Sequence, residues 1–300
     1  MSLENAIQVI PSGGPLAAEV RGVNLGQALA EAALATIRAA WRDHLVLLFR
    51  GQSLSDPQLI AFSRHLGDLD FCPPNDLGRT HIEAFPEIVV ISNVEENGRK
   101  LGSLGNYESL WHTDMSYCDV PPRASLLHSL EVPPSGGDTQ FANMYLVLER
   151  MPADLRREIE GAIVVHDASL DSVGARRKGL PDVTDPSQAP GARHPIVRVH
   201  PDTGREALYL GRRRNAYVLG LSVAESEKLL DRVWAHAMRP EFVWTQRWKA
   251  GDLVLWDNRC TMHRRDAFDA ATRRVMHRTQ VQGEPVRMPN GWTARARASA

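Results

Sequence analysis

Two short motifs, far apart in the chain, carry residue types that bind metal ions. The first is WHTD at 111–114. In an extended segment, residues i and i+2 point to the same face, so His112 and Asp114 could offer a nitrogen and an oxygen to one ion. The second motif, WDNRCTMH at 256–263, ends in His263. Two histidines and one carboxylate leave open positions on the metal, a pattern typical of non-haem Fe(II) sites.

The same residues have plainer interpretations. His112 could end a strand and Asp114 could stand in a turn, because HxD tripeptides are common by chance. His263 alone could be a core or surface residue. A zinc hydrolase could use the same three ligands, although HExxH or a third histidine is more usual there and neither occurs here. A cupin-like binding protein could also bind an anion at this site without turnover.

Two arginines follow the second motif. Arg274 and Arg278 are four residues apart, so in a strand both face the same side. Guanidinium groups on one face near a metal predict the binding of two carboxylates or similar anions. The alternative is two solvated charges on an edge strand.

Apolar periodicity and turn residues predict the elements that must position these side chains. Helices are expected at 27–42, 55–65, 143–160 with an interruption at Pro152, and 222–238. Strands are expected at 44–49, 87–92, 124–130, 163–166, 195–200, 242–248, 253–256 and 275–281. The strand-rich C-terminal half lacks βαβ alternation, which favours an antiparallel barrel or sandwich.

The chain of 300 residues is predicted to form one domain over 1–286. Within it, residues 167–193 are polar and rich in Gly and Pro, which is typical of a lid or binding loop. Residues 287–300 are expected to be an unstructured, disordered tail.

Composition excludes several classes of protein. The formal charge is −1, from 35 Lys and Arg against 36 Asp and Glu, which argues against nucleic acid as a partner. The longest apolar run, at 45–49, is too short to span a membrane, and no signal peptide is evident. The widely separated Cys72, Cys118 and Cys260 fit reduced thiols. We therefore expect a cytoplasmic protein.

An ordered series of motifs resembles the Fe(II)/2-oxoglutarate-dependent dioxygenases of the taurine dioxygenase and 2,4-dichlorophenoxyacetate dioxygenase family. The resemblance covers residues 15–285. It is carried by FRGQSLSDPQLIAFSRHLGDL (49–69), LWHTD (110–114), PPSGGDTQF (133–141), HPIVRVHPDTGREALYLG (194–211), WKAGDLVLWDNRCTMHR (248–264) and RRVMHRT (273–279).

The resemblance implies a fold, cofactors and roles. The fold would be mainly β with flanking α-helices: a double-stranded β-helix, that is, a cupin-like jelly roll. Fe(II) would be the cofactor, and 2-oxoglutarate and O2 the co-substrates. His112, Asp114 and His263 would hold Fe(II), while Thr139 and Arg274 would bind the distal carboxylate of 2-oxoglutarate. The family also suggests a homo-oligomer.

The implied primary substrate is a small organic anion bound by Arg278. Several stretches, including DNRC at 257–260, are closer to the 2,4-dichlorophenoxyacetate enzymes, which cleave an aryloxyalkanoate ether to a phenol and a 2-oxo acid. Segment 69–73 lacks the histidine that the taurine enzymes use for the sulfonate. Taurine, an alkyl sulfonate or sulfate, or another carboxylate are the alternatives.

Three further features concern the substrate pocket. Met115 directly follows the HxD motif and could line the pocket or be buried packing. Tyr217 could stack on an aryl ring or belong to the core or surface. The basic run Arg212-Arg213-Arg214 stands where the herbicide enzymes have histidines, and it could add anion affinity or form a solvated loop.

Overall fold

The computed structural model of the chain describes residues 7–71 and 81–294, and two sheets form its centre. The larger sheet has the strand order β1-β2-β3-β17-β9-β19-β4-β7 and is antiparallel except for the β2/β3 and β4/β7 pairs. Its strands, in that order, are Gln8–Pro11, Ala18–Arg21, Val46–Phe49, Leu253–Asp257, Ala124–Glu131, Val275–Val281, Val89–Ser92 and Ser103–Leu104.

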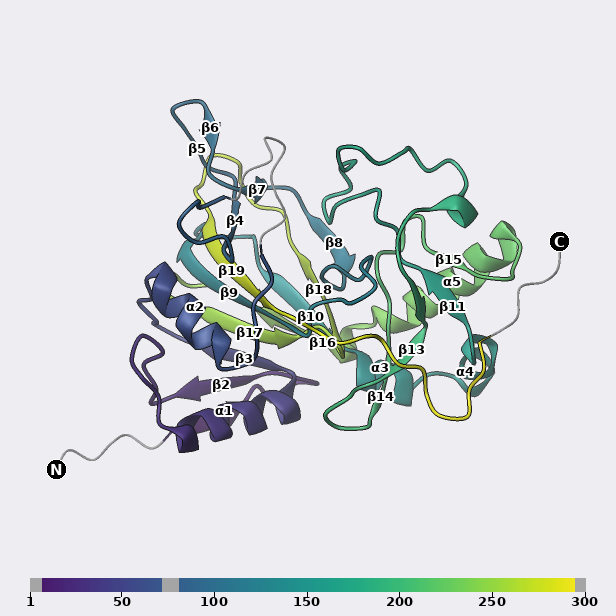
Figure 1. Ribbon diagram of the computed structural model, residues 1–300, viewed down its shortest axis with the longest axis horizontal. Coiled ribbons are helices and arrows are strands. Elements are labelled where there is room, and N and C mark those ends of the chain that lie inside the picture. Colours follow the sequence, from purple (N-terminus) through teal and green to yellow (C-terminus); the bar gives the residue numbers. More distant parts are fainter. Residues whose placement is uncertain (1–6, 72–80, 295–300) are drawn as a thin grey trace.

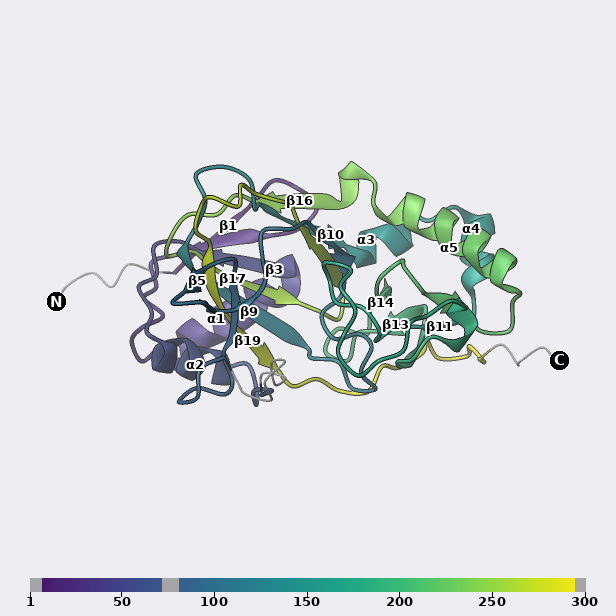
Figure 2. The same cartoon turned by 90° about the horizontal axis from the view of Figure 1, so that it is seen from above.

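The smaller sheet lies against the larger one, as Figures 1 and 2 show. Its four strands have the order β16-β10-β18-β8 and pair antiparallel. They are, in that order, Val243–Gln246, Thr139–Asn143, Thr261–Arg265 and Ser109–His112. Phe141 of β10 packs on Trp256 of β17 with ring centroids 5.5 Å apart, so side chains of the two sheets meet in a shared core.

Helices flank this pair of sheets on two sides (Figure 1). α1 and α2 lie beside the larger sheet, and α3, α4 and α5 lie beyond the smaller one. The helices are Glu31–His44, Asp56–Arg64, Met144–Glu149, Ala153–Ile159 and Val223–Ala237, with 3-10 turns η1 at Pro186–Gln188 and η2 at Pro240–Phe242. This arrangement confirms the predicted mainly β fold with flanking helices.

Short strands complete the structure on the α5 side and at the opposite rim. They are β11 (Ile163–Val165), β12 (Arg193–Pro195), β13 (Val197–Val199), β14 (Glu206–Leu208), β15 (Tyr217–Val218), β5 (Glu95–Glu96) and β6 (Arg99–Lys100). β12, β11 and β15 form one sheet, and β13 pairs with β14.

The central strands are continuous apolar runs in the sequence because their alternating side chains enter two different cores. In β17, Val254 and Trp256 join the core between the sheets, whereas Leu253 and Leu255 join the core under α1 and α2. A strand covered on both faces needs apolar residues at every position. Strands of this kind are the ones that apolar periodicity predicts correctly.

Some boundaries differ from the sequence expectations for local reasons. The first helix begins at Glu31 rather than at residue 27, because residues 24–27 form a turn. In this turn the Asn24 side chain accepts a hydrogen bond from the Gly26 amide, and the Asn24 carbonyl accepts one from the Gln27 amide. The capping boxes at Ser55 and Ser222 start α2 and α5 as expected. The strand predicted at 195–200 is split between β12 and β13.

The segment predicted as a lid, 167–193, is a long connection tied down at several points. Its Ser172 carbonyl accepts the amide of Leu110, and its Ala192 amide donates to the carbonyl of Tyr117. Both contacts are to the region around β8. Residues 282–294 have no helix or strand, yet the Arg287 carbonyl accepts the amide of Val199.

Two expectations fall partly outside the described residues. In segment 69–73, which lacks the sulfonate-binding histidine, Cys72 and Pro73 are not described, and neither are residues 295–300 of the tail. Among the described residues, no helix is both long enough and apolar enough to cross a membrane.

Candidate active site

The two metal-binding motifs meet on neighbouring strands of the smaller sheet. His112 ends β8, and His263 lies opposite it in β18 as its antiparallel partner. Their ring centroids are 4.2 Å apart, and Asp114 follows β8 by two residues. Ligand atoms of the three buried side chains all lie within 4.8 Å of one another. The structure thus gathers two imidazoles and one carboxylate at one point, although 149 residues separate Asp114 from His263.

The Asp114 carboxylate is held in its ionised form. Oδ2 accepts a hydrogen bond from the Ser125 hydroxyl at 2.8 Å, and Oδ1 accepts one from Nη1 of Arg278 at 3.0 Å. Burial opposes ionisation, but the charge of Arg278 and the two imidazoles outweigh it and hold the pKa of Asp114 well below its usual range. A carboxylate is the form that a metal ion binds.

Both imidazoles turn a ring nitrogen toward Asp114. Nδ1 of His112 lies 2.7 Å from the carbonyl oxygen of Leu110, so Nδ1 carries the proton and Nε2 keeps its lone pair. Nε2 of His112 and Nε2 of His263 lie 3.6 and 3.9 Å from Oδ1 of Asp114. Burial, followed by the proximity of His112, lowers the pKa of His263 to about 3. The donor set therefore fits a divalent ion such as Fe(II).

Arg274 is a buried cation that has no carboxylate partner among the described residues. Its side chain is 1% exposed, and among the described residues Nε and Nη1 have no hydrogen-bond acceptor. Burial, with a smaller effect of Arg265, lowers its pKa well below the usual range. A buried guanidinium without an acceptor is costly, so this one fits the carboxylate of a bound ligand such as 2-oxoglutarate.

Thr139 lies at the start of β10, close to the same region. Its hydroxyl accepts a hydrogen bond from Nε1 of Trp248 at 2.9 Å, which leaves the hydroxyl proton free to donate. The glycine turn before β10 packs against Arg274: a Cβ added to Gly137 would lie 3.5 Å from Nε of Arg274. The turn therefore brings the start of β10 to Arg274, as a shared carboxylate site requires.

The three residues predicted to bind the substrate, Arg278, Met115 and Tyr217, lie at different distances along the chain from the metal-ligand candidates and in different parts of the structure. Arg278 reaches Asp114, as described, and keeps a buried Nε without an acceptor among the described residues. Met115 is half-buried and has a φ of 46° in the turn after Asp114. Tyr217 lies in β15, where its hydroxyl donates to the Leu221 carbonyl, and not beside the three metal-ligand candidates.

Sequence reasoning missed the residues that support Asp114. The Ser125 hydroxyl, which donates to Asp114, accepts from Nδ2 of Asn258 at 2.9 Å and from Nε2 of Gln280 at 3.3 Å. All three side chains are buried. The available signal was a polar residue on the core face of a strand, as Ser125 is in β9 and Gln280 in β19.

A second buried group has metal-ligand residue types but a different chemistry. His200, Asp257 and Cys260 also bring ligand atoms within 4.8 Å of one another. However, Nε and Nη2 of Arg259 donate to the two oxygens of Asp257 at 2.9 and 2.7 Å. Nε2 of His200 lies 3.0 Å from Oδ2 of the same carboxylate. Because guanidinium and imidazole occupy both oxygens, this group is a buried ion-pair network.

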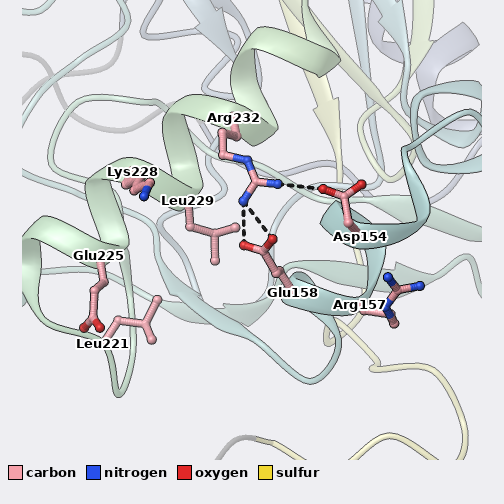
Figure 3. Close-up of a pocket in the computed structure, with 8 residues that line it drawn as sticks. All are labelled: Asp154, Arg157, Glu158, Leu221, Glu225, Lys228, Leu229 and Arg232. Carbon is pink, nitrogen blue, oxygen red and sulfur yellow. Dashed lines mark hydrogen bonds and ion pairs between the residues drawn. The ribbon is translucent and has the colours of Figure 1, made fainter.

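A surface groove between α4 and α5 is lined mainly by charged side chains and by none of the metal-ligand candidates just described (Figure 3). Arg232 of α5 crosses it and pairs with Asp154 at 3.0 Å and with Glu158 at 2.6 Å. These side chains are between 40% and 60% exposed, so their ion pairs contribute little energy. His112, Asp114 and His263 do not line this groove.

Comparison with known proteins identifies the family. The sequence model of the "Taurine catabolism dioxygenase TauD, TfdA family" matches residues 8–280. An alpha-ketoglutarate-dependent 2,4-dichlorophenoxyacetate dioxygenase from Cupriavidus pinatubonensis is 38% identical over 90% of this chain and 96% of its own. An alpha-ketoglutarate-dependent sulfate ester dioxygenase from Pseudomonas putida is 32% identical over 93% of this chain and 90% of its own.

A solved structure gives the same result for the fold. The crystal structure of a taurine dioxygenase from Burkholderia xenovorans superposes with a TM-score of 0.76 at 33% identity, covering 95% of this chain and 94% of that one. Family, fold and the buried His-Asp-His group agree. The chain therefore belongs to the TauD/TfdA family and is a 2-oxoglutarate-dependent dioxygenase that requires Fe(II) and O2.

Proposed function

We propose that this dioxygenase hydroxylates an aryloxyalkanoate at the carbon between the ether oxygen and the carboxylate. The hemiacetal that results collapses to a phenol and a 2-oxo acid. For an aryloxyacetate, substrate, 2-oxoglutarate and O2 are converted to phenol, glyoxylate, succinate and CO2. When bound, Fe(II) with 2-oxoglutarate and O2 supplies the oxidising chemistry.

In this proposal His112, Asp114 and His263 hold the iron. They would supply two nitrogens and one oxygen to the ion, a donor set that leaves room for 2-oxoglutarate and O2. The Leu110 carbonyl fixes the tautomer and ring orientation of His112, and Ser125 orients the Asp114 carboxylate. Supporting contacts of this kind raise metal affinity and fix the open face.

Thr139 and Arg274 bind the distal carboxylate of 2-oxoglutarate. The observation that carries this assignment is the buried, unpartnered guanidinium of Arg274. A carboxylate placed there would satisfy its donors in a charge-assisted pair, and the Thr139 hydroxyl would add a third donor. Because Thr139 and Arg274 are both buried, such a pair would also fix the position of the 2-oxo acid relative to the metal.

Arg278 binds the carboxylate of the primary substrate, and Met115, in the turn after Asp114, contributes to its pocket. Arg278 donates a hydrogen bond to the metal-ligand candidate Asp114, and its buried Nε has no acceptor among the described residues. Both observations support this role. The substrate class is supported by the 38% identity to a 2,4-dichlorophenoxyacetate dioxygenase over nearly the full length of both chains.

The test is succinate formation with Fe(II), 2-oxoglutarate and O2 across a panel of substrates. The panel contains aryloxyacetates, aryloxypropionates, taurine, alkyl sulfates and free amino acids. We expect stoichiometric succinate and phenol from an aryloxyalkanoate. Succinate without phenol would contradict the ether cleavage while leaving the dioxygenase intact.

A second candidate is oxidation of a sulfate ester, favoured by the similarity to the Pseudomonas putida enzyme. It uses the same metal and 2-oxoglutarate residues and differs in the anion presented to Arg278. In the same panel it predicts inorganic sulfate and an aldehyde from an alkyl sulfate. The homo-oligomeric state and the cytoplasmic location expected from the sequence stay predictions.

A further inference from the structure

The connection between β14 and β15 carries three consecutive arginines in three different environments. Arg213 pairs with Glu227 at 2.7 Å and with Asp231 at 2.6 Å, both on α5. Arg214 is exposed to solvent. Arg212 is half-buried, and its buried Nε has no hydrogen-bond acceptor among the described residues. Only Arg213 of the three thus behaves as a surface ion-pair residue.

The backbone that carries Arg212 is fixed against the turn that bears Asp114. The Thr113 hydroxyl, between the two metal-ligand candidates of the HxD motif, donates to the Leu210 carbonyl at 2.8 Å. The next residue must be glycine, because a Cβ on Gly211 would lie 2.6 Å from Nδ1 of His166 and 2.9 Å from Oγ of Ser116. Arg212 therefore leaves the backbone beside the metal-ligand turn.

The Arg212 side chain approaches the ring of Tyr117, which follows the metal-ligand turn. Its guanidinium carbon lies 5.8 Å from the ring centroid of Tyr117, three residues after Asp114. Burial lowers the pKa of Arg212, and the charge of Arg177 lowers it further. The charges of Asp114 and Asp171 favour the charged form of Arg212 and act to raise its pKa.

Arg177, from the 167–193 segment, approaches the same ring. Its guanidinium carbon lies 3.8 Å from the Tyr117 centroid. The segment is anchored there, since the Arg177 amide donates to Ser169 and the Ala192 amide donates to Tyr117. Within the described part of the chain, no carboxylate forms an ion pair with Arg177 or Arg212. Two guanidinium groups from separate segments, neither in an ion pair with a described carboxylate, thus gather at the ring of Tyr117.

We propose that Arg212 and Arg177, with the ring of Tyr117, form a second anion-binding subsite, and that the primary substrate is a small organic dianion. The inference rests on the proposed function. One anionic group, next to the oxidised carbon, binds Arg278. A second carboxylate, sulfonate or sulfate at the other end of the substrate binds Arg212 and Arg177.

The position of Arg212 separates this subsite from the other two arginines. Arg278 belongs to β19 of the larger sheet, and Arg274 directly precedes that strand. Arg212 instead lies in the connection between β14 and β15. A single substrate carboxylate held from the β19 side would leave the Arg212 charge partly buried and unpaired, which is costly. A second anion removes that cost.

The test compares binding of matched monoanions and dianions. The protein is loaded with Mn(II) and N-oxalylglycine, an inert analogue of 2-oxoglutarate, so that no turnover occurs. Titration calorimetry at fixed ionic strength then gives Kd for two pairs of probes: phenoxyacetate with 4-sulfophenoxyacetate, and hexanoate with adipate. The variants are Arg212→Met and Arg177→Met, and the matched control is Arg214→Met, which removes an exposed charge of the same run.

We expect the dianion of at least one pair to bind roughly 10- to 100-fold more tightly than its monoanion in the unmodified protein. Arg212→Met removes most of that advantage, Arg177→Met removes a smaller part, and Arg214→Met leaves it unchanged. Binding of N-oxalylglycine stays the same in all three variants. A long-range charge effect would instead affect Arg212→Met and Arg214→Met alike.

Three results would overturn the second subsite. They are equal Kd values within both pairs, an Arg212→Met variant that weakens both members of a pair equally, and one that weakens N-oxalylglycine instead. The proposed function is judged separately by succinate and phenol release from aryloxyalkanoates. An Arg212-dependent preference for adipate without phenol release would keep the subsite and reject the aryl ether substrate.

Discussion

Two buried aspartates, Asp114 and Asp257, each lie next to other residues of metal-binding types. Their roles in the structure nevertheless differ. Each lies with other metal-ligand residue types, and each is 4% exposed or less. Asp257 is bound by both ends of the Arg259 fork and by His200. Asp114 has one donor on each oxygen, and its Oδ1 also faces the Nε2 atoms of His112 and His263.

The difference shows that donor count, more than residue type, separates a metal site from an ion-pair network. A carboxylate that is fully used by a guanidinium stabilises the fold and offers no lone pair to an ion. A deprotonated carboxylate that keeps free lone pairs, beside two imidazole nitrogens, can bind a metal ion. The predictions below test this distinction, beginning with the largest expected effect.

Replacing Asp114 with Ala should abolish activity without unfolding the protein. Removal of one of three metal ligands is expected to lower succinate formation more than about a thousandfold, equivalent to roughly 4 kcal/mol. The thermal unfolding temperature should fall, because Arg278 loses its buried carboxylate partner, but the variant should still fold. Circular dichroism and succinate assays measure the two effects. Retained activity would remove Asp114 from the metal centre.

Asp257→Asn should show the reverse pattern, with stability lost rather than chemistry. It leaves Arg259 and His200 buried without their shared carboxylate, which costs roughly 3–4 kcal/mol of unfolding free energy. The pKa of Asp257 is lowered in the fold by Arg259 against burial. Its stabilising effect is therefore complete above the unfolded pKa of about 4 and is lost as the pH falls below that value.

Urea unfolding of the Asp257→Asn variant between pH 3 and 7 checks this sign. The unmodified protein should lose stability steeply below about pH 4. The variant should be less stable at neutral pH and should lose less on acidification. Parallel curves would mean that Asp257 does not titrate with unfolding.

Arg274→Gln and Arg278→Gln should separate the two organic ligands. Loss of a buried charge partner costs roughly 2–3 kcal/mol, so Arg274→Gln should raise the KM for 2-oxoglutarate about 30- to 100-fold. Arg278→Gln should chiefly raise the KM for the primary substrate. Steady-state kinetics with one ligand varied at a time provides the measurement, and equal effects on both ligands would contradict the division.

Ser125→Ala should give the smallest effect. The change removes one hydrogen bond to Oδ2 of Asp114 but leaves the contact of Arg278 with Oδ1. Loss of a residue that orients a metal ligand lowers metal affinity by roughly tenfold. Titration with Fe(II) under anaerobic conditions measures this shift. An unchanged affinity would show that Asn258 and Gln280 can take over the role of Ser125.

The sequence predicted the larger sheet better than the smaller one, and burial explains why. Strands β3 and β17 are apolar at nearly every position because both faces are covered. β18 reads TMHRR and β10 reads TQFAN, and no strand was expected at either. Thr139 of β10 and His263 of β18 are polar yet buried at the site, so apolar periodicity does not detect these strands.

Within the site, the metal-ligand types and the HxD spacing could be read from the sequence. The pairing of His263 with His112 could not, because strand register joins residues that are distant in the chain. Ser125 was missed for a similar reason: its role depends on the position of β9 between β17 and β19. The different environments of Arg212, Arg213 and Arg214 also arise from tertiary contacts alone.

Metal binding in matched variants tests the central claim most directly. Electron paramagnetic resonance measures free Mn(II) in titrations of the unmodified protein, Asp114→Ala and Cys260→Ser. The account predicts one equivalent of bound Mn(II) in the unmodified protein and in Cys260→Ser, and none in Asp114→Ala. Bound metal that survives in Asp114→Ala but is lost in Cys260→Ser would move the metal centre to the second group and contradict the account.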